Sequence, residues 1–158
     1  MAPDAYIIAA HSAADFEAAH TLFAEYEAEI AASVCFPHVP DEPKQIQATY
    51  LPPRGSLLLA RMDEDDAVVG SAGFCPLEED ICELKRVYVR PSMRGSSLGR
   101  RLTLEAIDRA RAAGYRRMVL HTLTSMRAAH ALYRSLGFRD GTSYGDPVEG
   151  AVYMDLLL

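Results

Sequence analysis

Residues Leu84–Leu102, LKRVYVRPSMRGSSLGRRL, hold a strand-like run that breaks into a Gly/Ser loop and then opens onto a helix. The first amides of a helix have no intrahelical acceptor, and the aligned peptide dipoles place partial positive charge there. Gly95 and Gly99 lack a Cβ, so the backbone can turn sharply and approach a bulky anion closely. The stretch therefore predicts a phosphate site at residues 96–100.

The same residues also allow a plainer interpretation. Pro91 would end the strand, Ser96 or Ser97 would cap the helix, and Gly95 would only make the turn. Short motifs of this kind arise easily by chance. The choice between the two interpretations depends on the rest of the chain.

Length and charge restrict the partners of this chain. With 158 residues, 49% of them apolar, it can bury a sizeable core, and we expect one domain over residues 1–158. The net charge of −6 argues against nucleic acid, which needs a basic field, so a phosphate site must be local. The basic residues near the loop, which favour an anionic cofactor, are Arg86, Arg90, Arg94, Arg100, Arg101, Arg109, Arg111, Arg116 and Arg117.

Targeting and metal-binding signals are missing from the sequence. The start of the chain has no basic region, and no run approaches the roughly 18 apolar residues of a membrane helix. We therefore expect a cytoplasmic protein without a membrane partner. Cys35, Cys75 and Cys82 form no Cys-x-x-Cys pair, and no two histidines are spaced i, i+4. We expect reduced thiols and no metal site.

Hydrophobic periodicity and turn residues predict the elements before the loop. The acidic run Asp63–Asp66 is interpreted as a solvated hairpin turn, because it lacks the central glycine of a calcium-binding loop. The expected elements are a strand over Tyr6–Ala10, a helix from a Ser12–Asp15 cap to about Ile30, a loop over Ala31–Pro40, a helix over Asp41–Tyr50, and strands over Ser56–Met62, Ala67–Cys75 and Ile81–Val89.

After the loop, apolar residues recur at helical spacing from Leu98 until Gly114 ends the helix. That helix joins two strands in a crossover, which predicts one parallel pair and an α/β (α+β) fold class. The further expected elements are a strand over Arg117–Thr122, a helix from Ser125 to Gly137, a strand from Phe138 onward and a final strand over Ala151–Leu157.

Two motifs in this order resemble the GCN5-related N-acetyltransferases, the GNAT superfamily. Arg94–Gly99 follows the family pattern Arg/Gln-x-x-Gly-x-Gly, and Leu132-Tyr133 followed by Gly137-Phe138 is a second, independent match. The resemblance covers nearly the whole chain. It implies a mixed, mostly antiparallel sheet of about six to seven strands, flanked by about four helices, with a parallel pair at the acyl-CoA cleft.

The same resemblance implies acetyl-CoA as co-substrate. Backbone groups of the strand would pair with the pantetheine arm, and the loop amides would hold the pyrophosphate. Ser97 stands where the family usually has its first glycine, and Met126 where many members carry an asparagine. The expected cofactor-binding residues are Val87, Tyr88, Val89, Arg94, Gly95, Ser96, Ser97, Leu98, Gly99, Arg100, Ser125 and Tyr133.

Two residues are candidates for catalysis. Tyr133, at the family motif, would protonate the departing thiolate; without the motif it would be a tyrosine packed on a helix face. An amine acceptor must lose a proton before it attacks, and Glu83, at the start of the strand, is the leading candidate for the base. The alternative for Glu83 is a solvent-facing carboxylate with no catalytic role.

The implied reaction is direct transfer of the acetyl group to an amine within a ternary complex, and a homodimer is compatible with the family. The alternative is a noncatalytic acyl-CoA sensor, which would need the loop but not Tyr133. A Rossmann-like half is disfavoured because no early βαβ unit bears a Gly-rich turn. The residues that would line an acceptor pocket but are left outside the catalytic set are Phe36, His38, His121, Tyr144 and Tyr153.

Overall fold

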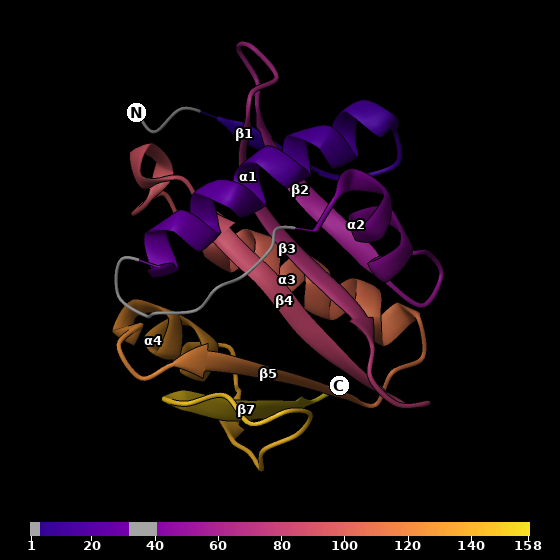
Figure 1. Ribbon diagram of the computed structural model, residues 1–158, viewed down its shortest axis with the longest axis vertical. Coiled ribbons are helices and arrows are strands. Elements are labelled where there is room, and N and C mark those ends of the chain that lie inside the picture. Colours follow the sequence, from indigo (N-terminus) through magenta and orange to yellow (C-terminus); the bar gives the residue numbers. More distant parts are fainter. Residues whose placement is uncertain (1–3, 32–40) are drawn as a thin grey trace.

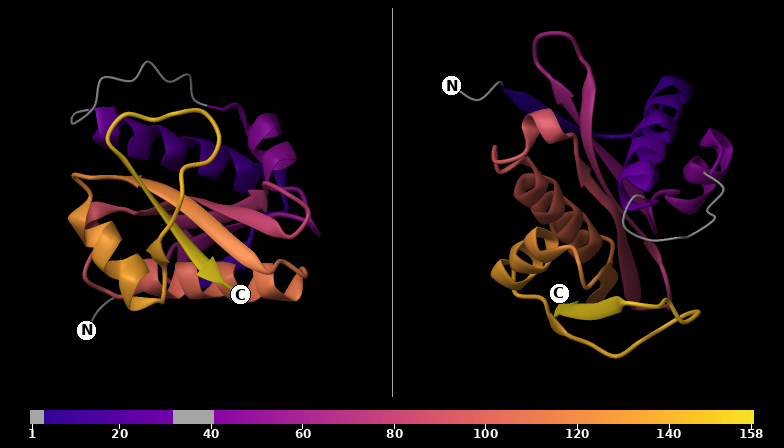
Figure 2. Two further views of the ribbon diagram at one scale, coloured as in Figure 1. Left: turned by 90° about the horizontal axis from the view of Figure 1, so that it is seen from below. Right: turned by 60° about the vertical axis from the view of Figure 1, so that its left-hand side comes forward.

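The computed structural model describes residues 4–31 and 41–158, apart from the side chain of Ala31. The loop expected before Pro40, with Cys35, Phe36 and His38, lies outside these residues. A central sheet separates two pairs of helices (Figures 1 and 2). None of the helices in the described ranges is long and apolar enough to cross a membrane.

The described residues form one seven-stranded sheet of order β1-β2-β3-β4-β5-β7-β6. All neighbouring strands are antiparallel except β4 and β5, which confirms the mixed, mostly antiparallel sheet and its one parallel pair. The strands are β1 (Ala5–Ala9), β2 (Ser56–Met62), β3 (Val68–Pro76), β4 (Ile81–Val89), β5 (Arg117–Leu123), β6 (Arg139–Asp140) and β7 (Ala151–Leu157).

Helices cover both faces of the sheet, α1 and α2 on one side and α3 and α4 on the other (Figure 2). Alternate residues of β2 therefore enter two cores: Leu58 packs in the cluster that contains Leu102 of α3, and Leu57 in the one that contains Leu22 of α1. The helices are α1 (Ala13–Ala31), α2 (Pro43–Thr49), α3 (Leu98–Ala112) and α4 (Arg127–Ser135), with a 3₁₀ turn at Pro91–Met93.

The helix α1 begins as its sequence predicts. The Ser12 hydroxyl accepts a hydrogen bond from the amide of Asp15, 3.1 Å away. The Asp15 carboxylate in turn accepts from the amides of His11 and Ser12. Burial raises the pKa of Asp15, but these backbone hydrogen bonds outweigh it and lower the value to about 2.

Some element ends differ from the sequence prediction. The helix α4 begins at Arg127, two residues after Ser125, because Met126 has the non-helical backbone of the N-cap. The strand expected from Phe138 is reduced to the two residues of β6, since the Gly/Pro-rich segment after Gly141 forms a loop. The helix α2 is also shorter than expected, with Glu42 at its N-cap and Pro43 at its first position.

The parallel pairing of β4 and β5 is short. It joins Ile81 with Arg117, Cys82 with Met118 and Glu83 with Val119, and then stops. Beyond Glu83, β4 continues beside β3 while β5 continues beside β7, so the two strands diverge (Figure 1). The second half of β4 thus keeps an unpaired backbone edge in the middle of the sheet.

A β-bulge lies in that half of β4. The register with β3 shifts between Ser71 and Gly73, so that β4 has an extra residue there. Arg86, at the bulge, has φ = 60°, and its carbonyl accepts a hydrogen bond of 2.6 Å from the buried Ser71 hydroxyl. The bulge changes the direction of the strand just before Val87 and Val89.

Candidate active site

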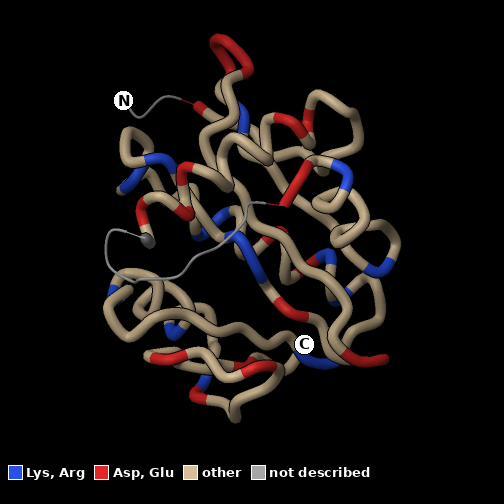
Figure 3. Tube along the Cα trace, viewed as in Figure 1, with Lys and Arg blue, Asp and Glu red and all other residues tan. Residues whose placement is uncertain are grey.

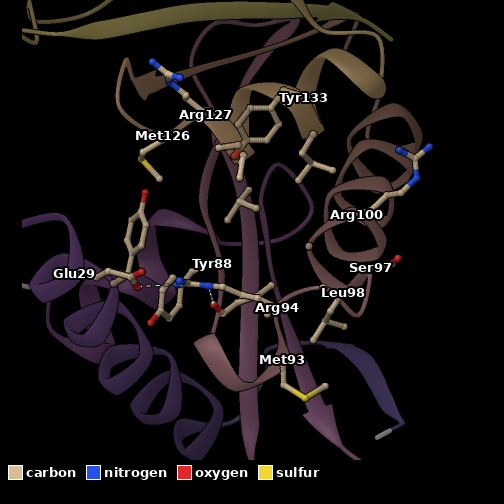
Figure 4. A pocket seen from close by; sticks show the side chains of 18 of the residues that line it. Glu29, Tyr88, Met93, Arg94, Ser97, Leu98, Arg100, Met126, Arg127 and Tyr133 are labelled. Carbon is tan, nitrogen blue, oxygen red and sulfur yellow. Dashed lines mark hydrogen bonds and ion pairs between the residues drawn. The ribbon is translucent and has the colours of Figure 1, made fainter. Parts of the chain in front are cut away.

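A cavity of about 930 Å³ lies at the unpaired edge of β4 (Figure 4). This volume is in the range of sites that bind drug-sized molecules and cofactors. Three regions that are distant in the sequence, residues 26–30, 87–100 and 125–133, form its walls. Its lining consists of Tyr26, Glu29 and Ile30 of α1, Val87–Val89 of β4, Met93–Gly95 and Ser97 of the loop, Leu98–Arg100 of α3, and Ser125–Ala129, Leu132 and Tyr133 of α4 and the turn before it.

The start of α3 points backbone donors at this cavity. The amide of Arg101 is the first in α3 to bond to a preceding carbonyl, that of Ser97, at 3.0 Å. The amides of Leu98, Gly99 and Arg100 precede it in the first helical turn, where no intrahelical acceptor exists. Since all three residues line the cavity, the positive N-terminal end of α3 faces the part of the cavity where a bound anion would lie.

The two serines of the loop have different roles from those expected. Ser97 is the N-cap residue of α3, yet its side chain makes no capping hydrogen bond. Its backbone is left-handed, with φ = 65°, a conformation that glycine adopts without strain. Ser96 does not line the cavity, and its hydroxyl donates to the carbonyl of Met93 at 2.5 Å. The alternative interpretation, in which the side chain of Ser96 or Ser97 caps α3, was therefore wrong.

The two glycines of the loop serve different purposes. Gly95 has φ = 81°, and a Cβ added to it would meet no atom within 4 Å, so its backbone conformation alone requires glycine. A Cβ on Gly99 would lie 3.6 Å from Val89 and 3.8 Å from Leu132, which are ordinary contacts. The fold therefore has room for a Cβ at position 99. If glycine is required there, the reason is a ligand bound in the cavity.

Ion pairs neutralise several arginines of the basic patch seen in the sequence. Figure 3 marks where the Lys and Arg positions (blue) and the Asp and Glu positions (red) lie along the chain. Three arginines of β4 and the loop pair with three glutamates of α1, as Arg86–Glu27, Arg90–Glu25 and Arg94–Glu29, with nitrogen–oxygen distances of 2.8–2.9 Å. Of the other arginines, Arg100 and Arg127 line the cavity and have no ion-pair partner within the described residues. They are its available cations.

Arg94 is held in three ways at the cavity wall. Its guanidinium bonds to the Glu29 carboxylate at 2.8 Å and to the carbonyl of Val89 at 3.0 Å, and it lies over the Tyr88 ring (Figure 4). The bond to Val89 shows that this carbonyl points away from β3, toward the open side. Arg94 therefore occupies an acceptor that the sequence analysis assigned to a bound ligand.

Tyr133 places a phenol in the cavity wall. Its ring packs in the α3-side core against Phe138, with centroids 5.7 Å apart, and only 7% of the residue is exposed. Figure 4 shows the hydroxyl directed into the cavity. Burial, and then the nearby Tyr26, raise the pKa of Tyr133, so the phenol keeps its proton at neutral pH and is available as a donor.

Glu83 lies outside the cavity lining, in a cluster of its own. Its Oε2 accepts a hydrogen bond of 2.8 Å from the Tyr144 hydroxyl and lies 3.6 Å from Nδ1 of His121. Its Oε1 is 3.9 Å from the Lys85 ammonium. Burial raises the pKa of Glu83, but the hydrogen bonds from His121 and Tyr144 outweigh it and lower the value below the ordinary range.

No group of three or more His, Cys, Asp or Glu side chains within the described ranges is arranged to hold a metal. Cys75 and Cys82 are free and buried, and burial raises the pKa of the Cys82 thiol to about 12. A protonated, buried thiol is a poor nucleophile. The chemistry of the cavity thus belongs to backbone amides, arginines and the Tyr133 phenol.

Comparison with known proteins identifies the family. A sequence model of the acetyltransferase (GNAT) family matches residues 24–138. The chain belongs to the GNAT family. An uncharacterized N-acetyltransferase of Schizosaccharomyces pombe is 39% identical over 137 residues, which are 85% of this chain and 83% of that protein. This confirms the family resemblance and the assignment as an N-acetyltransferase.

Other GNAT proteins agree over different lengths. YjgM of Escherichia coli, also an uncharacterized N-acetyltransferase, is 41% identical over 80 residues, about half of each chain (49% and 48%). The structure of yncA from Salmonella typhimurium, solved with its cofactor acetyl-CoA, superposes with a TM-score of 0.76 at 24% identity. The superposition covers 97% of this chain and 93% of that one, and it shows that the two share the GNAT fold.

Sequence reasoning did not find the α1 side of this GNAT cavity. Tyr26, Glu29 and Ile30 lie about 60 residues before the loop, and no local motif links them to it. Arg127 was also missed, although its position at the start of a helix, two residues after Ser125, is a usable signal. Of the twelve expected cofactor-binding residues, Ser96 is the one that does not line the cavity.

Proposed function

We propose that this protein transfers an acetyl group from acetyl-CoA directly to an amine within a ternary complex. The observation that carries the proposal is one cavity that combines the unpaired edge of β4, the amides of the α3 N-terminus and the Tyr133 phenol. A strand edge fits a pantetheine arm, and a helix N-terminus with two arginines free of ion pairs in the described ranges fits a pyrophosphate. The residues present therefore suit acetyl-CoA.

When bound, acetyl-CoA supplies the activated acetyl thioester. The backbone of Val87 and Val89 would orient the arm, and an amide there would stabilise the negative charge that develops on the carbonyl oxygen. Leu98, Gly99 and Arg100 would hold the pyrophosphate through their amides, aided by the side chains of Arg100 and Arg127. Arg94 would leave the Val89 carbonyl for the phosphates.

Tyr133 is proposed as the general acid. Its raised pKa keeps the phenol protonated at neutral pH, and the core contacts of its ring fix its position. Glu83 would take part in removing the proton from the amine acceptor. Its lowered pKa makes it a weak base by itself, so its partners in the cluster matter.

The proposal is tested in two steps. Thermal unfolding with and without acetyl-CoA measures binding, since a ligand at about 100 times its dissociation constant stabilises the native state by about 2.7 kcal/mol. Release of CoA thiol is then followed across amino acids, polyamines and lysine peptides. Stabilisation without thiol release from any amine would support the acyl-CoA sensor instead. No stabilisation by any acyl-CoA would contradict both functions.

A further inference from the structure

Four side chains from three parts of the chain form a cluster beside β4 and β5. His121 contacts the rings of Tyr144 and Tyr153, with centroid separations of 6.2 and 6.0 Å, and these two tyrosines contact each other at 5.4 Å. Glu83 completes the cluster through its contacts with His121 and Tyr144. The cluster combines a titratable imidazole with a carboxylate, and none of its four residues lines the cofactor cavity.

The sheet register fixes where His121 lies. Glu83 pairs with Val119, so His121 is two residues further along β5, about 7 Å closer to the end where the strands diverge. Leu120 packs in the core beside α3, so its neighbour His121 points to the opposite face. His121 therefore lies further than Glu83 toward the end where the strands diverge, and its side chain is on the sheet face opposite α3.

Glu83 and His121 differ in their hydrogen bonds and in their exposure. One Glu83 oxygen already accepts the Tyr144 proton, and 13% of the Glu83 side chain is exposed. The His121 side chain is 37% exposed, and its Nε2 has no hydrogen-bond partner in the described ranges, while Nδ1 faces the carboxylate. A carboxylate on one imidazole nitrogen leaves the other as the proton acceptor and stabilises the imidazolium that results.

We propose that His121 is the general base of the acetyl transfer and that Glu83 and Tyr144 are positioning residues. This inference rests on the proposed function. An alkylammonium acceptor gives one proton to Nε2 of His121, and the nitrogen–carbon bond forms as the carbon–sulfur bond breaks. The thiolate takes the proton of Tyr133. The second nitrogen proton and the proton on His121 pass to solvent, which returns one to Tyr133.

Other charged and titratable groups lie near His121. Lys85 of β4 lies 3.9 Å from Glu83 and weakens the field of that carboxylate at the imidazole. Tyr153 is directly opposite His121 on β7, and Asp155 is opposite Val119, two residues before His121 on β5. Tyr144, in the loop before β7, withdraws charge from Glu83 through its hydrogen bond. Removing Glu83 takes a negative charge away from the imidazole, whereas removing Tyr144 leaves the full carboxylate charge facing it.

The test is the pH dependence of kcat, from pH 5.5 to 9, for wild type, His121→Gln, Glu83→Gln and Tyr144→Phe. The acceptor is the amine in the panel above that releases CoA fastest, at saturating concentration. Acetyl-CoA affinity and thermal unfolding are measured for each variant to establish that it is folded and binds the co-substrate. His11→Gln is the matched control, because that imidazole is 81% exposed and remote from β4 and β5.

We expect His121→Gln to lower kcat about 100-fold, with unchanged acetyl-CoA affinity, and to abolish the acidic limb of the profile. Glu83→Gln should keep the limb but move it to lower pH, and Tyr144→Phe should move it to higher pH. Loss of the limb in Glu83→Gln with its retention in His121→Gln would overturn the assignment and make Glu83 the base. A wild-type protein that releases CoA from no amine would instead contradict the proposed function.

Discussion

The two faces of the sheet at the diverging strands β4 and β5 differ in the groups that they present: backbone amides on one face and side chains on the other. On the α3 side, a loop and a helix start supply backbone amides, and one continuous stretch of about twenty residues contains most of them. On the opposite side, the cluster around Glu83 is made of side chains from β4, β5, β7 and the loop before β7. Backbone donors at a helix start depend on conformation, whereas the cluster depends on residue identity.

The difference determines how each side responds to mutation. A substitution in the α3 loop acts through backbone conformation or by filling space, because the amides remain. A substitution in the Glu83 cluster removes the functional atom itself. The following changes test this contrast, from the largest expected effect to the smallest.

Tyr133→Phe should have the largest effect, because it removes a proton donor but keeps the ring in the core. We expect kcat to fall about 100-fold, with acetyl-CoA affinity changed by less than about twofold. Stopped assays of thiol release and calorimetric titration measure the two quantities. An unchanged kcat would exclude Tyr133 as the general acid.

Gly99→Ala should change stability and binding in opposite directions. The new Cβ makes only ordinary contacts, and alanine is favoured over glycine within a helix by about 1 kcal/mol, so the free protein should unfold at higher temperature. The methyl group enters the space where the pyrophosphate would lie, and we expect acetyl-CoA affinity to fall about tenfold, a loss of about 1.4 kcal/mol. Unchanged affinity would place the phosphates elsewhere.

Arg127→Ala should weaken acetyl-CoA binding about fivefold, because it removes one of the two available cations from the cavity wall. The loss should shrink at high salt, where the interaction is screened. Arg109→Ala is the matched control, since Arg109 pairs with Glu105 and does not line the cavity. Equal effects of the two substitutions would mean that only net charge matters.

Tyr144→Phe tests the side-chain cluster through stability. The pKa of Glu83 is lower in the folded protein than in the unfolded chain, where it is near 4.3. The ionised carboxylate therefore stabilises the fold at pH values above 4.3, and this stabilisation is lost as the pH falls through the pKa of the folded state. The variant should therefore be about 1 kcal/mol less stable at pH 7, and the difference should narrow at pH 3. Urea unfolding at both pH values measures it. A constant difference would mean that the bond does not depend on the Glu83 charge.

Ser97→Gly should give the smallest change. Glycine removes the strain of the left-handed backbone but adds freedom to the unfolded chain, so we expect a net gain of about 0.5 kcal/mol and a slightly higher Tm. Ser96→Gly is the paired control and should lower Tm, because it loses the hydroxyl bond to Met93. A lower Tm for Ser97→Gly would show that its hydroxyl stabilises the loop.

Local signals explain what the sequence predicted. The strand, loop and helix from Ile81 to Ala112 follow from periodicity and glycine placement, and Ser12–Asp15 is a local cap. The ends of α4 and β6 were misplaced because the backbone at Met126 and after Gly141 depends on contacts with the rest of the fold. The predicted strand and helix order was confirmed, including the parallel pair.

The residue pairs that the sequence did not predict are contacts between positions far apart in the chain. The pairing of Arg94 with Glu29 joins residues 65 positions apart, and that of Glu83 with Tyr144 joins residues 61 apart. Nothing in either local sequence indicates the partner. The basic patch was interpreted as favouring an anionic cofactor for the same reason, since the glutamates that neutralise Arg86, Arg90 and Arg94 lie far away in the sequence, on α1.

The early end of the parallel pairing after Glu83 gives this sheet a third edge, between its two outer ones. An unpaired strand edge is a template for another chain, and natural sheets protect such edges with charge or cover. Here the Arg94 guanidinium already bonds to one of its carbonyls. Under the proposed function this contact would open for acetyl-CoA, so the contact and the bound ligand would each shield the edge from adding a foreign strand, and occupancy of the cavity should protect the protein from aggregation.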